Sequence, residues 1–274
     1  MTINCNGELI YLDRPKVMGI LNVTPDSFFD GGRYEDEKSV LQQVEKMLKD
    51  GATFIDVGAY SSKPGALDVN QETELKRIVP IVKIILKHFP DAILSIDTFR
   101  GTVAKECIDQ GAALINDISA GLRDENMLRT VAKLGVPYIM MHMRGTSQNM
   151  QQQTDYIDLL KEVVSYFSER LVIAKSLGIK DIIIDPGFGF AKTLEQNYAL
   201  LQQLELLQLI SHPVLAGISR KSMIYKLLET TPENALNGTT ALHMVCLSKG
   251  AHILRVHDVK EAMECIQLNE QLNA

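Results

Sequence analysis

Eight short apolar runs recur along the chain, and polar residues of a chemically useful kind stand at or near their ends. The runs are rich in Val, Ile and Leu and do not alternate with polar residues, which is typical of parallel strands buried on both faces. They lie at residues 17–21, 54–57, 93–96, 114–115, 138–141, 182–184, 214–218 and 252–256. Stretches with helical spacing of apolar residues separate them, for example 40–48, 159–174 and 235–247. A strand and a helix repeated eight times predict a (β/α)8 barrel of the TIM type, with its active site at the carboxyl ends of the strands.

Five glycines mark points where a helical stretch ends and the next apolar run begins. Glycine just after a helix adopts the left-handed conformation that turns the chain back. The five are Gly51, Gly111, Gly135, Gly178 and Gly250. A doubly wound open sheet uses the same unit, but eight units in 274 residues fit the usual size of a barrel. We therefore expect one domain over residues 1–274, with a hairpin at residues 2–12, turning at Asn6-Gly7, over the amino-terminal end of the barrel.

Composition and charge argue against several classes of protein. With 28 Lys and Arg against 34 Asp and Glu, the net charge is −6, whereas a general nucleic-acid-binding protein needs a basic face. No run of about eighteen apolar residues predicts a membrane span, and the amino terminus lacks the apolar core of a signal peptide. The four cysteines form no CxxC pair and fit small buried residues in a reducing cytosol. We expect a cytoplasmic enzyme that acts on small molecules.

Two segments after the first and second runs have the composition of active-site loops. Residues 22–32 contain two adjacent phenylalanines, Phe28 and Phe29, and a lid over a planar ligand explains them better than a purely structural loop. Residues 61–66 read Ser-Ser-Lys-Pro-Gly-Ala, and their hydroxyls and cation suit phosphate. Any turn rich in Ser, Pro and Gly would look similar.

The later strand ends carry groups of two kinds. Arg255 and His257 alternate on the last strand, so their side chains point the same way. Two cations at the barrel mouth are costly without an anionic partner, which indicates a phosphorylated substrate. Asp97, Asn116 and Asp185 instead favour a planar heterocycle rich in N–H donors, such as a pterin or guanine. The carboxylates could also be metal ligands, although catalytic metal sites usually show clustered His or several Asp on adjacent strands.

Three further features leave alternatives open. Residues 219–222, Ser-Arg-Lys-Ser, precede a helical stretch, where backbone N–H groups favour an anion. Asp185 begins the run Asp-Pro-Gly-Phe-Gly-Phe, whose glycines would let a ligand approach the backbone, but a capping Asp before a tight turn explains the run as well. His142 could face the barrel mouth or be structural.

Taken in order, these residues resemble the dihydropteroate synthases, a family of pterin-binding enzymes. The resemblance runs from about Pro15 to His257 and is most specific at 19–28, Gly-Ile-Leu-Asn-Val-Thr-Pro-Asp-Ser-Phe, and at 185–190. Shorter matches follow in the family's order at 55–58, 95–98, 115–117, 141–143, 219–222 and 255–257. One departure lies at residues 60–65, where the family commonly has Glu-Ser-Thr-Arg-Pro-Gly and this chain has Tyr-Ser-Ser-Lys-Pro-Gly, with Tyr60 and Lys63 as the changes.

The resemblance implies a transferase of folate biosynthesis and a sulfonamide target. Such an enzyme joins 6-hydroxymethyl-7,8-dihydropterin diphosphate to 4-aminobenzoate and releases 7,8-dihydropteroate and diphosphate. It also implies residue roles, with Asp97, Asp185 and Lys221 as the catalytic set and a homodimer as the assembly. The pterin would be bound by Asp97, Asn116, Asp185, Lys221 and Arg255, the diphosphate by Ser62, Arg255 and His257, the 4-aminobenzoate by Phe28, Pro64, Phe190 and Ser222, and Mg²⁺ by Asn22.

Two other interpretations are compatible with a pterin pocket. A pterin-dependent methyltransferase would share the barrel but would not need the Arg255 and His257 pair or the segment at 22–32. A catalytically silent pterin-binding protein would be expected to have lost these features, and both are intact in this sequence.

Overall fold

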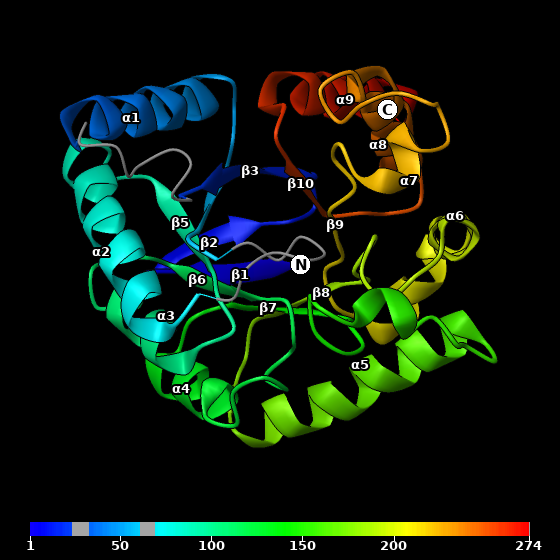
Figure 1. Ribbon diagram of the computed structural model, residues 1–274, viewed down its shortest axis with the longest axis horizontal. Helices are drawn as coiled ribbons and strands as arrows, with labels where there is room; N and C mark the ends of the chain where they lie inside the picture. Colours follow the sequence, from blue (N-terminus) through cyan, green and yellow to red (C-terminus); the bar gives the residue numbers. More distant parts are fainter. Residues whose placement is uncertain (24–32, 61–68, 274) are drawn as a thin grey trace.

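The computed structural model describes residues 1–23, 33–60 and 69–273 and has the expected barrel architecture (Figure 1). Eight parallel strands follow the order β8-β7-β6-β5-β4-β3-β10-β9. A parallel bridge between Ile184 and Val214 joins the two strands at the ends of this order, so the sheet closes on itself. The helices surround the closed sheet, which confirms the predicted (β/α)8 barrel.

Each predicted apolar run overlaps a strand of the barrel. The strands are β3 (Lys16–Asn22), β4 (Phe54–Gly58), β5 (Ile93–Asp97), β6 (Leu114–Asp117), β7 (Tyr138–Met141), β8 (Ile182–Asp185), β9 (Leu215–Ala216) and β10 (Ile253–Val256). The helices are α1 (Arg33–Lys49), α2 (Gln71–His88), α3 (Gly101–Ile108), α4 (Met127–Leu134), α5 (Leu159–Ser176), α6 (Leu194–Gln202), α7 (Ser222–Tyr225), α8 (Leu236–Ser248) and α9 (Val259–Leu272), with short 3-10 turns at Met150–Gln152 and Leu204–Ile210. Only β9 is clearly shorter than its run, since two of the five residues predicted at 214–218 form ladder pairs.

Local sequence signals explain where several helices begin and how they end. α2 begins after Asn70 and α5 after Asp158, and each of these side chains accepts a hydrogen bond from the first turn of its helix. α6 begins with a capping box between Thr193 and Gln196. The five glycines predicted to follow helices all have positive φ, from +67° to +105°, as a left-handed chain reversal requires. None of the described helices has the length and apolar character needed to span a membrane.

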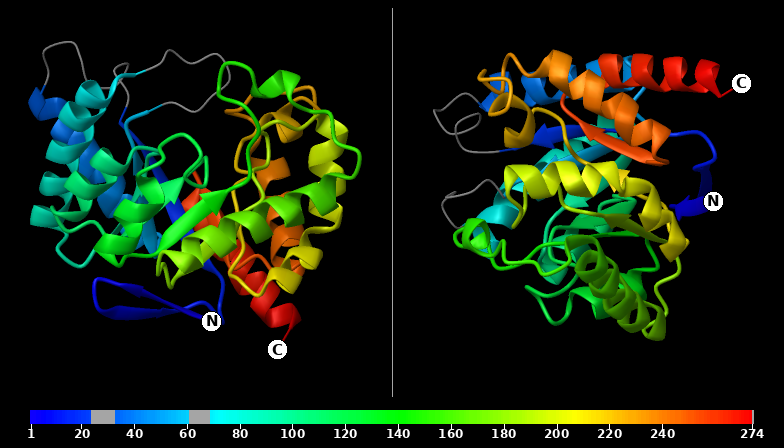
Figure 2. Two further views of the ribbon diagram at one scale, coloured as in Figure 1. Left: turned by 90° about the horizontal axis from the view of Figure 1, so that it is seen from below. Right: turned by 90° about the vertical axis from the view of Figure 1, so that its right-hand side faces the viewer.

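The amino-terminal hairpin lies across the end of the barrel where the strands begin (Figure 2). β1 (Thr2–Cys5) pairs antiparallel with β2 (Glu8–Tyr11), and Asn6 and Gly7 both have positive φ in the turn. Its apolar side chains pack in one cluster with the first inward-facing residues of the strands. The hairpin therefore closes the bottom of the barrel, as the sequence predicted.

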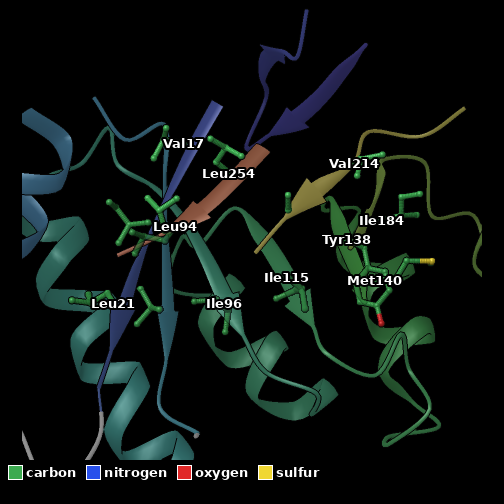
Figure 3. Packing of buried hydrophobic residues seen from close by; sticks show 14 of the residues in the cluster. Val17, Leu21, Leu94, Ile96, Ile115, Tyr138, Met140, Ile184, Val214 and Leu254 are labelled. Carbon is green, nitrogen blue, oxygen red and sulfur yellow. The ribbon is translucent and has the colours of Figure 1, made fainter. Parts of the chain in front are cut away.

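Alternate residues on each strand face the inside of the barrel, and the inside changes from apolar to polar along its axis. The layer of inward-facing side chains nearest the amino-terminal hairpin is apolar, and its members are Met18, Phe54, Ile93, Leu114, Ile139, Ile183, Leu215 and Ile253. We call it the bottom layer. The residues between them, such as Val17, Leu94 and Tyr138, face the helices and form the main core (Figure 3). Fully burying one large apolar side chain contributes about 1.5–3 kcal/mol. Two positions beyond the bottom layer, several strands carry polar side chains instead, and these form the site.

Candidate active site

Arg255 lies at the centre of the polar end of the barrel, between two carboxylates. Its Nε donates to Oδ2 of Asp56 at 2.6 Å, and its Nη2 donates to Oδ2 of Asp97 at 2.7 Å. The Asp56 side chain is fully buried, and those of Asp97 and Arg255 are 14% and 19% exposed. Burial disfavours the charge of Arg255, but the carboxylates of Asp56 and Asp97 outweigh it and raise the pKa of the guanidinium above its usual value. Arg255 is therefore a permanent cation that β4 and β5 hold in place.

These ion pairs overturn one step of the sequence argument. Arg255 was expected to be a cation without an anionic partner, and that expectation is wrong, because Asp56 and Asp97 both pair with it. His257, at the exposed rim, has its Nδ1 3.0 Å from Oγ of Ser219, and its backbone N–H donates to the same oxygen at 3.1 Å. The charge of Arg255 is thus not by itself evidence for a phosphate at this end of the barrel.

Asp56 is a site residue that the sequence reasoning missed, although it lies within one of the apolar runs. It lies two residues after Phe54 on β4, and both side chains face the inside of the barrel. Its carboxylate also accepts a hydrogen bond from Nδ2 of Asn116 at 3.0 Å. The signal that reveals it is strand parity. On a strand where Phe54 faces inward, Asp56 must face inward as well, because side chains alternate with a period of two.

Asp97 and Asp185 are the other two carboxylates of the site. Burial raises the pKa of Asp97 to about 7, with Arg255 opposing the rise and Asp56 adding to it. Burial also raises the pKa of Asp185, whereas Lys221 and the N–H of Gly187 oppose the rise. Oδ1 of Asp185 accepts from that N–H at 2.7 Å. Both groups are carboxylates that a ligand with N–H donors would stabilise in their charged form.

Lys221 faces Asp185 from the segment that precedes α7. Its Nζ donates to the carbonyl of Phe188 and lies 4.5 Å from the ring centre of Phe190. Burial lowers the pKa of Lys221 to about 8, and the Asp185 carboxylate opposes this. The preceding residue, Arg220, adopts a left-handed backbone with φ +54° and pairs with Asp258 at 2.8 Å. The two neighbouring cations thus have different roles. Arg220 holds the segment against the start of α9, whereas the side chain of Lys221 extends into the site.

The loop after β8 owes its shape to two glycines. A Cβ on Gly187, which has φ +69°, would lie 2.1 Å from the carbonyl oxygen of His142. A Cβ on Gly189, which has φ +81°, would lie 3.2 Å from Cδ of Lys221. From the sequence, two explanations of this run were open, namely that its glycines let a ligand approach the backbone or that Asp185 caps a tight turn. In the structure these glycines let the loop pack against the end of β7 and leave room for Lys221.

Lys192 holds this loop in place and is a second residue that the sequence reasoning missed. Its Nζ lies 3.0 Å from Nδ1 of His142 and donates to the carbonyls of Gly187 at 3.0 Å and Phe190 at 3.1 Å. Burial lowers the pKa of Lys192 to about 7. Three acceptors around one nitrogen nevertheless require three N–H groups, so the charged ammonium is the form that fits. In the sequence this lysine looks like any surface lysine before a helix.

His142 belongs to the same cluster and does not face the barrel mouth. Its ring contacts Tyr166 of α5 at a centroid distance of 4.8 Å, and the side chain is almost completely buried. Burial, with Lys192 and Arg144 adding to it, lowers the pKa of His142 to about 2. It is therefore a neutral histidine that accepts a hydrogen bond from Lys192, and the structural alternative left open by the sequence is confirmed.

Replacing Lys192 with Met should destabilise the protein and disorder the loop after β8. Met fills the space of the lysine stem but leaves the carbonyl of Phe190 and Nδ1 of His142 without their donor, at about 1–3 kcal/mol for each buried acceptor, whereas the carbonyl of Gly187 keeps the N–H of Phe190. Chemical denaturation should show a lower free energy of unfolding. Lys180→Met, at an exposed position just before β8, is the matched control. Equal stability of the two variants would contradict the role assigned to Lys192.

The structure gathers most of the predicted site residues at one end of the barrel. Asp97, Asn116, Asp185 and Arg255 face its interior, and a Cβ added at Gly217 would lie 3.8 Å from Oδ2 of Asp185 and 3.9 Å from Cβ of Arg255. Asn22, Ser222 and His257 lie at its rim, the first of them beside Gly58 in the sheet. Phe28, Ser62, Lys63 and Pro64 lie outside the described residues. Among the described residues, no cluster of three or more His, Cys, Asp or Glu side chains could hold a metal ion.

Tyr60, the larger departure from the family pattern, is buried beside the site. Its ring packs edge-on against Phe99 at 5.0 Å, and its hydroxyl lies 3.5 Å from Oγ of Ser147. The guanidinium groups of Arg100 and Arg123 lie 4.6 Å and 3.6 Å from the ring centre of Phe99. Aromatic and cation–π contacts therefore hold this position, where the family commonly has a carboxylate.

Comparisons with known proteins agree with this geometry. A family model described as "Pterin binding enzyme" matches residues 18–257. The dihydropteroate synthase of Escherichia coli (strain K12) is 41% identical over 272 residues, which cover 98% of this chain and 96% of that protein. A Yersinia pestis dihydropteroate synthase solved in complex with a sulfonamide drug superposes with a TM-score of 0.93 at 41% identity, covering 100% and 99% of the two chains. The Xanthomonas albilineans enzyme solved with 4-aminobenzoic acid has a TM-score of 0.92 at 37% identity, with 100% and 98% covered.

Proposed function

Because this chain belongs to the dihydropteroate synthase family of pterin-binding enzymes, we propose that it joins 6-hydroxymethyl-7,8-dihydropterin diphosphate to 4-aminobenzoate in folate biosynthesis. The observation that carries the proposal is the set of groups at the polar end of the barrel. Carboxylates of Asp97 and Asp185 and the amide of Asn116 lie around the same space as the cations Lys221 and Arg255. A pterin has both N–H donors and ring acceptors along its edges, so it matches such a mixed set.

The pterin ring would be bound by this set in a water-poor space. Asp97, Asn116 and Asp185 would accept from its N–H groups, Lys221 would donate to a ring acceptor, and Arg255 would lie against the ring. Hydrogen bonds to charged groups contribute about 1.5–3 kcal/mol each, and more when a buried partner is otherwise left unpaired. The same residues would orient the exocyclic methylene toward the rim, where Asn22, Ser222 and His257 lie.

The bond that breaks joins the methylene carbon to the diphosphate, and the bond that forms joins that carbon to the nitrogen of 4-aminobenzoate. As the leaving group departs, positive charge grows on the methylene and on the electron-rich dihydropterin. The carboxylates of Asp97 and Asp185 would stabilise that charge. Arg255, His257 and Ser62 would donate hydrogen bonds to the departing diphosphate, and after attack the aniline nitrogen would release its proton to water or to the diphosphate. No protein nucleophile is needed, and Lys221 would hold the ring in place during departure.

Asn22 fits the role of protein ligand to Mg²⁺. Its amide oxygen is a hard donor at the exposed end of β3. Mg²⁺ keeps most of its water and often takes only one or two protein ligands beside substrate phosphates, so one amide is sufficient. When bound, the ion would neutralise the diphosphate and make it a better leaving group.

Asn22→Ala should raise the Mg²⁺ concentration needed for half-maximal diphosphate release by roughly 10- to 100-fold, the range typical of lost metal-site partners. The measurement is a Mg²⁺ titration of the initial rate at saturating substrates. Asn126→Ala, an exposed asparagine before α4 whose side chain caps nothing, is the control. An unchanged Mg²⁺ titration curve for Asn22→Ala would remove this residue from the metal site.

The second substrate would bind at the rim of the barrel. Phe190 and Ser222 lie beside Lys221 there, and Phe28 and Pro64 are proposed to complete the pocket for 4-aminobenzoate. Sulfonamides are expected to occupy the same pocket, since the Yersinia pestis relative was solved with such a drug. We also propose that residues 1–274 form one pterin-binding domain and that two copies form a homodimer. A cytoplasmic location fits the four buried, unpaired cysteines.

One assay tests the activity directly. The protein is incubated with the pterin diphosphate, 4-aminobenzoate and Mg²⁺, and both diphosphate and 7,8-dihydropteroate are measured. The proposal is supported if the two products form in equal amounts and if diphosphate release falls sharply when 4-aminobenzoate is omitted. Diphosphate release that does not depend on 4-aminobenzoate would point to a hydrolase and contradict it. A Lys221→Ala variant serves as the control for contaminating activity.

A further inference from the structure

Asp56 has none of the substrate contacts proposed above, yet it lies at the centre of the site. Its side chain is 0% exposed. One of its oxygens, Oδ2, accepts both from Nε of Arg255 at 2.6 Å and from Nδ2 of Asn116 at 3.0 Å. Its two partners come from β10 and β6, on opposite sides of β4 in the order of the sheet. Asp56 therefore connects two groups that are both proposed to contact the pterin.

The contact with Asn116 fixes which end of that amide faces the ligand. An ionised carboxylate only accepts hydrogen bonds, so the amide must turn its NH2 group toward Asp56. The amide oxygen of Asn116 is then directed away from Asp56 and remains available as an acceptor. If position 56 carried no charge, the amide could flip and present a donor instead.

The contact with Arg255 fixes the plane of the guanidinium. Arg255 uses Nε on Asp56 and Nη2 on Asp97, so two carboxylates from neighbouring strands hold one planar group. A guanidinium held at two of its nitrogens has little freedom to rotate, and its flat face stays available for stacking on a ring. Asp97 alone would hold it at one point only.

Stability does not explain why the chain keeps a carboxylate at this position. The second oxygen, Oδ1, is buried and has no hydrogen-bond partner among the described residues. A buried charge with one unsatisfied oxygen is costly, and replacing a whole buried ion pair by well-packed apolar residues of similar volume is often neutral or stabilising. Ser95, the sheet neighbour of Asp56 on β5, is equally buried, and its Oγ also has no partner in the described part of the chain.

We propose that Asp56 is a positioning residue that sets the hydrogen-bond pattern of the pterin pocket, by holding the plane of Arg255 and by turning the carbonyl of Asn116 toward the ligand. The proposal rests on the function proposed above. Asp56 thereby makes the site selective for ligands that offer N–H donors to Asn116 and a flat ring to Arg255.

The carboxylate of Asp56 also acts on its neighbour Asp97, which gives a second readout. The charged groups that act on Asp97 are Arg255 from β10, Asp56 from β4, Glu74 from α2, Asp117 from β6 and Lys221 before α7. Burial raises the pKa of Asp97 to about 7, Arg255 opposes this, and the other carboxylates add to it. Removing the charge of Asp56 should therefore lower the pKa of Asp97. Pterin affinity in the wild type should weaken as pH falls through about 7, and in the variant it should weaken at lower pH.

The test compares Asp56→Asn with Ser95→Ala, which changes a buried polar side chain at the same level of the neighbouring strand. Calorimetry with 6-hydroxymethylpterin from pH 5.5 to 8.5 gives the affinity, and thermal unfolding gives the stability. We expect Asp56→Asn to fold and to bind the pterin at least tenfold more weakly than the wild type at pH 8. The pH below which its pterin affinity falls should be lower than in the wild type. Ser95→Ala should match the wild type within threefold and keep its pH midpoint.

Three outcomes would overturn the assignment. They are binding by Asp56→Asn within threefold of the wild type, a loss of affinity with no movement of the pH midpoint, and failure of the variant to fold. Either of the last two would make Asp56 a purely structural residue. A wild-type protein that binds no pterin at all would instead refute the proposed function, so the two failures are distinguishable.

Discussion

Replacing Asp185 with Asn should weaken pterin binding by roughly 30-fold to several thousand-fold while leaving the protein folded. Removing one member of a buried charge pair from a binding site costs about 2–5 kcal/mol, and each 1.4 kcal/mol is tenfold in affinity. The fold should survive because the asparagine keeps Oδ1, which accepts from the N–H of Gly187 at 2.7 Å and shapes the loop after β8. The charge opposite Lys221 is lost, whereas the turn is kept.

Lys221→Ala should produce a loss of the same order from the other side of the pair. It removes the cation that opposes the raised pKa of Asp185, so that carboxylate becomes harder to keep ionised. Calorimetry with a pterin at pH 8 measures both variants. There are two controls. Asp181→Asn makes the same substitution just before β8, at the end of the strand opposite to Asp185. Lys226→Ala makes the same substitution as Lys221→Ala at an exposed lysine five residues later in the chain. Wild-type affinity in both site variants would show that the pterin does not bind between these residues.

Arg255→Met should have the largest effect on stability, lowering the free energy of unfolding by about 3–5 kcal/mol. The substitution leaves Asp56 and Asp97 as buried carboxylates without their shared cation. For a chain of this length, about 2–4 °C is lost for each kcal/mol, so the melting temperature should fall by roughly 6–20 °C. Pterin binding should be lost as well, since the same guanidinium is proposed to lie against the ring.

The pH dependence identifies the cause of this loss. Burial raises the pKa of Asp97 to about 7 while Arg255 opposes the rise, so without Arg255 the pKa of this carboxyl should rise further above its unfolded value of about 4. Such groups destabilise the fold above their folded-state pKa, and the penalty disappears as pH falls and they become neutral. The difference in melting temperature from the wild type should therefore shrink as the pH falls toward about 7, where Asp97 takes up a proton in the wild type as well.

Two matched variants complete the experiment. Arg14→Met removes an arginine that forms a bidentate pair with Glu270 on the surface, and it should change the stability little. Asp56→Asn in the Arg255→Met background removes one of the two uncompensated charges and should restore part of the lost stability. A stability defect in Arg255→Met that does not depend on pH and is not relieved by Asp56→Asn would mean that packing, not charge, is responsible.

Several parts of the fold could be predicted because they depend on local properties of the chain. Parallel strands buried on both faces must be apolar throughout, and glycine is favoured where a helix must reverse in the left-handed conformation. The eight strands and the positive φ of the five glycines follow from these two requirements. The ends of the strands could be predicted as well, since Asp97, Asn116 and Asp185 stand where an apolar run stops. In a closed barrel all these ends meet.

What the sequence could not decide is which side chains meet across the barrel. Arg255 is 199 residues from Asp56 and 158 from Asp97, and no local pattern relates residues so far apart. Sequence reasoning therefore treated Arg255 as an unpaired cation and passed over Asp56. The direction of His142 and the burial of Lys192 were equally undetermined, because a lysine looks the same in the sequence whether it faces water or three acceptors. Strand patterns by themselves determined where polar groups stand along the chain, and only closure of the barrel decided their partners and hence their charge states.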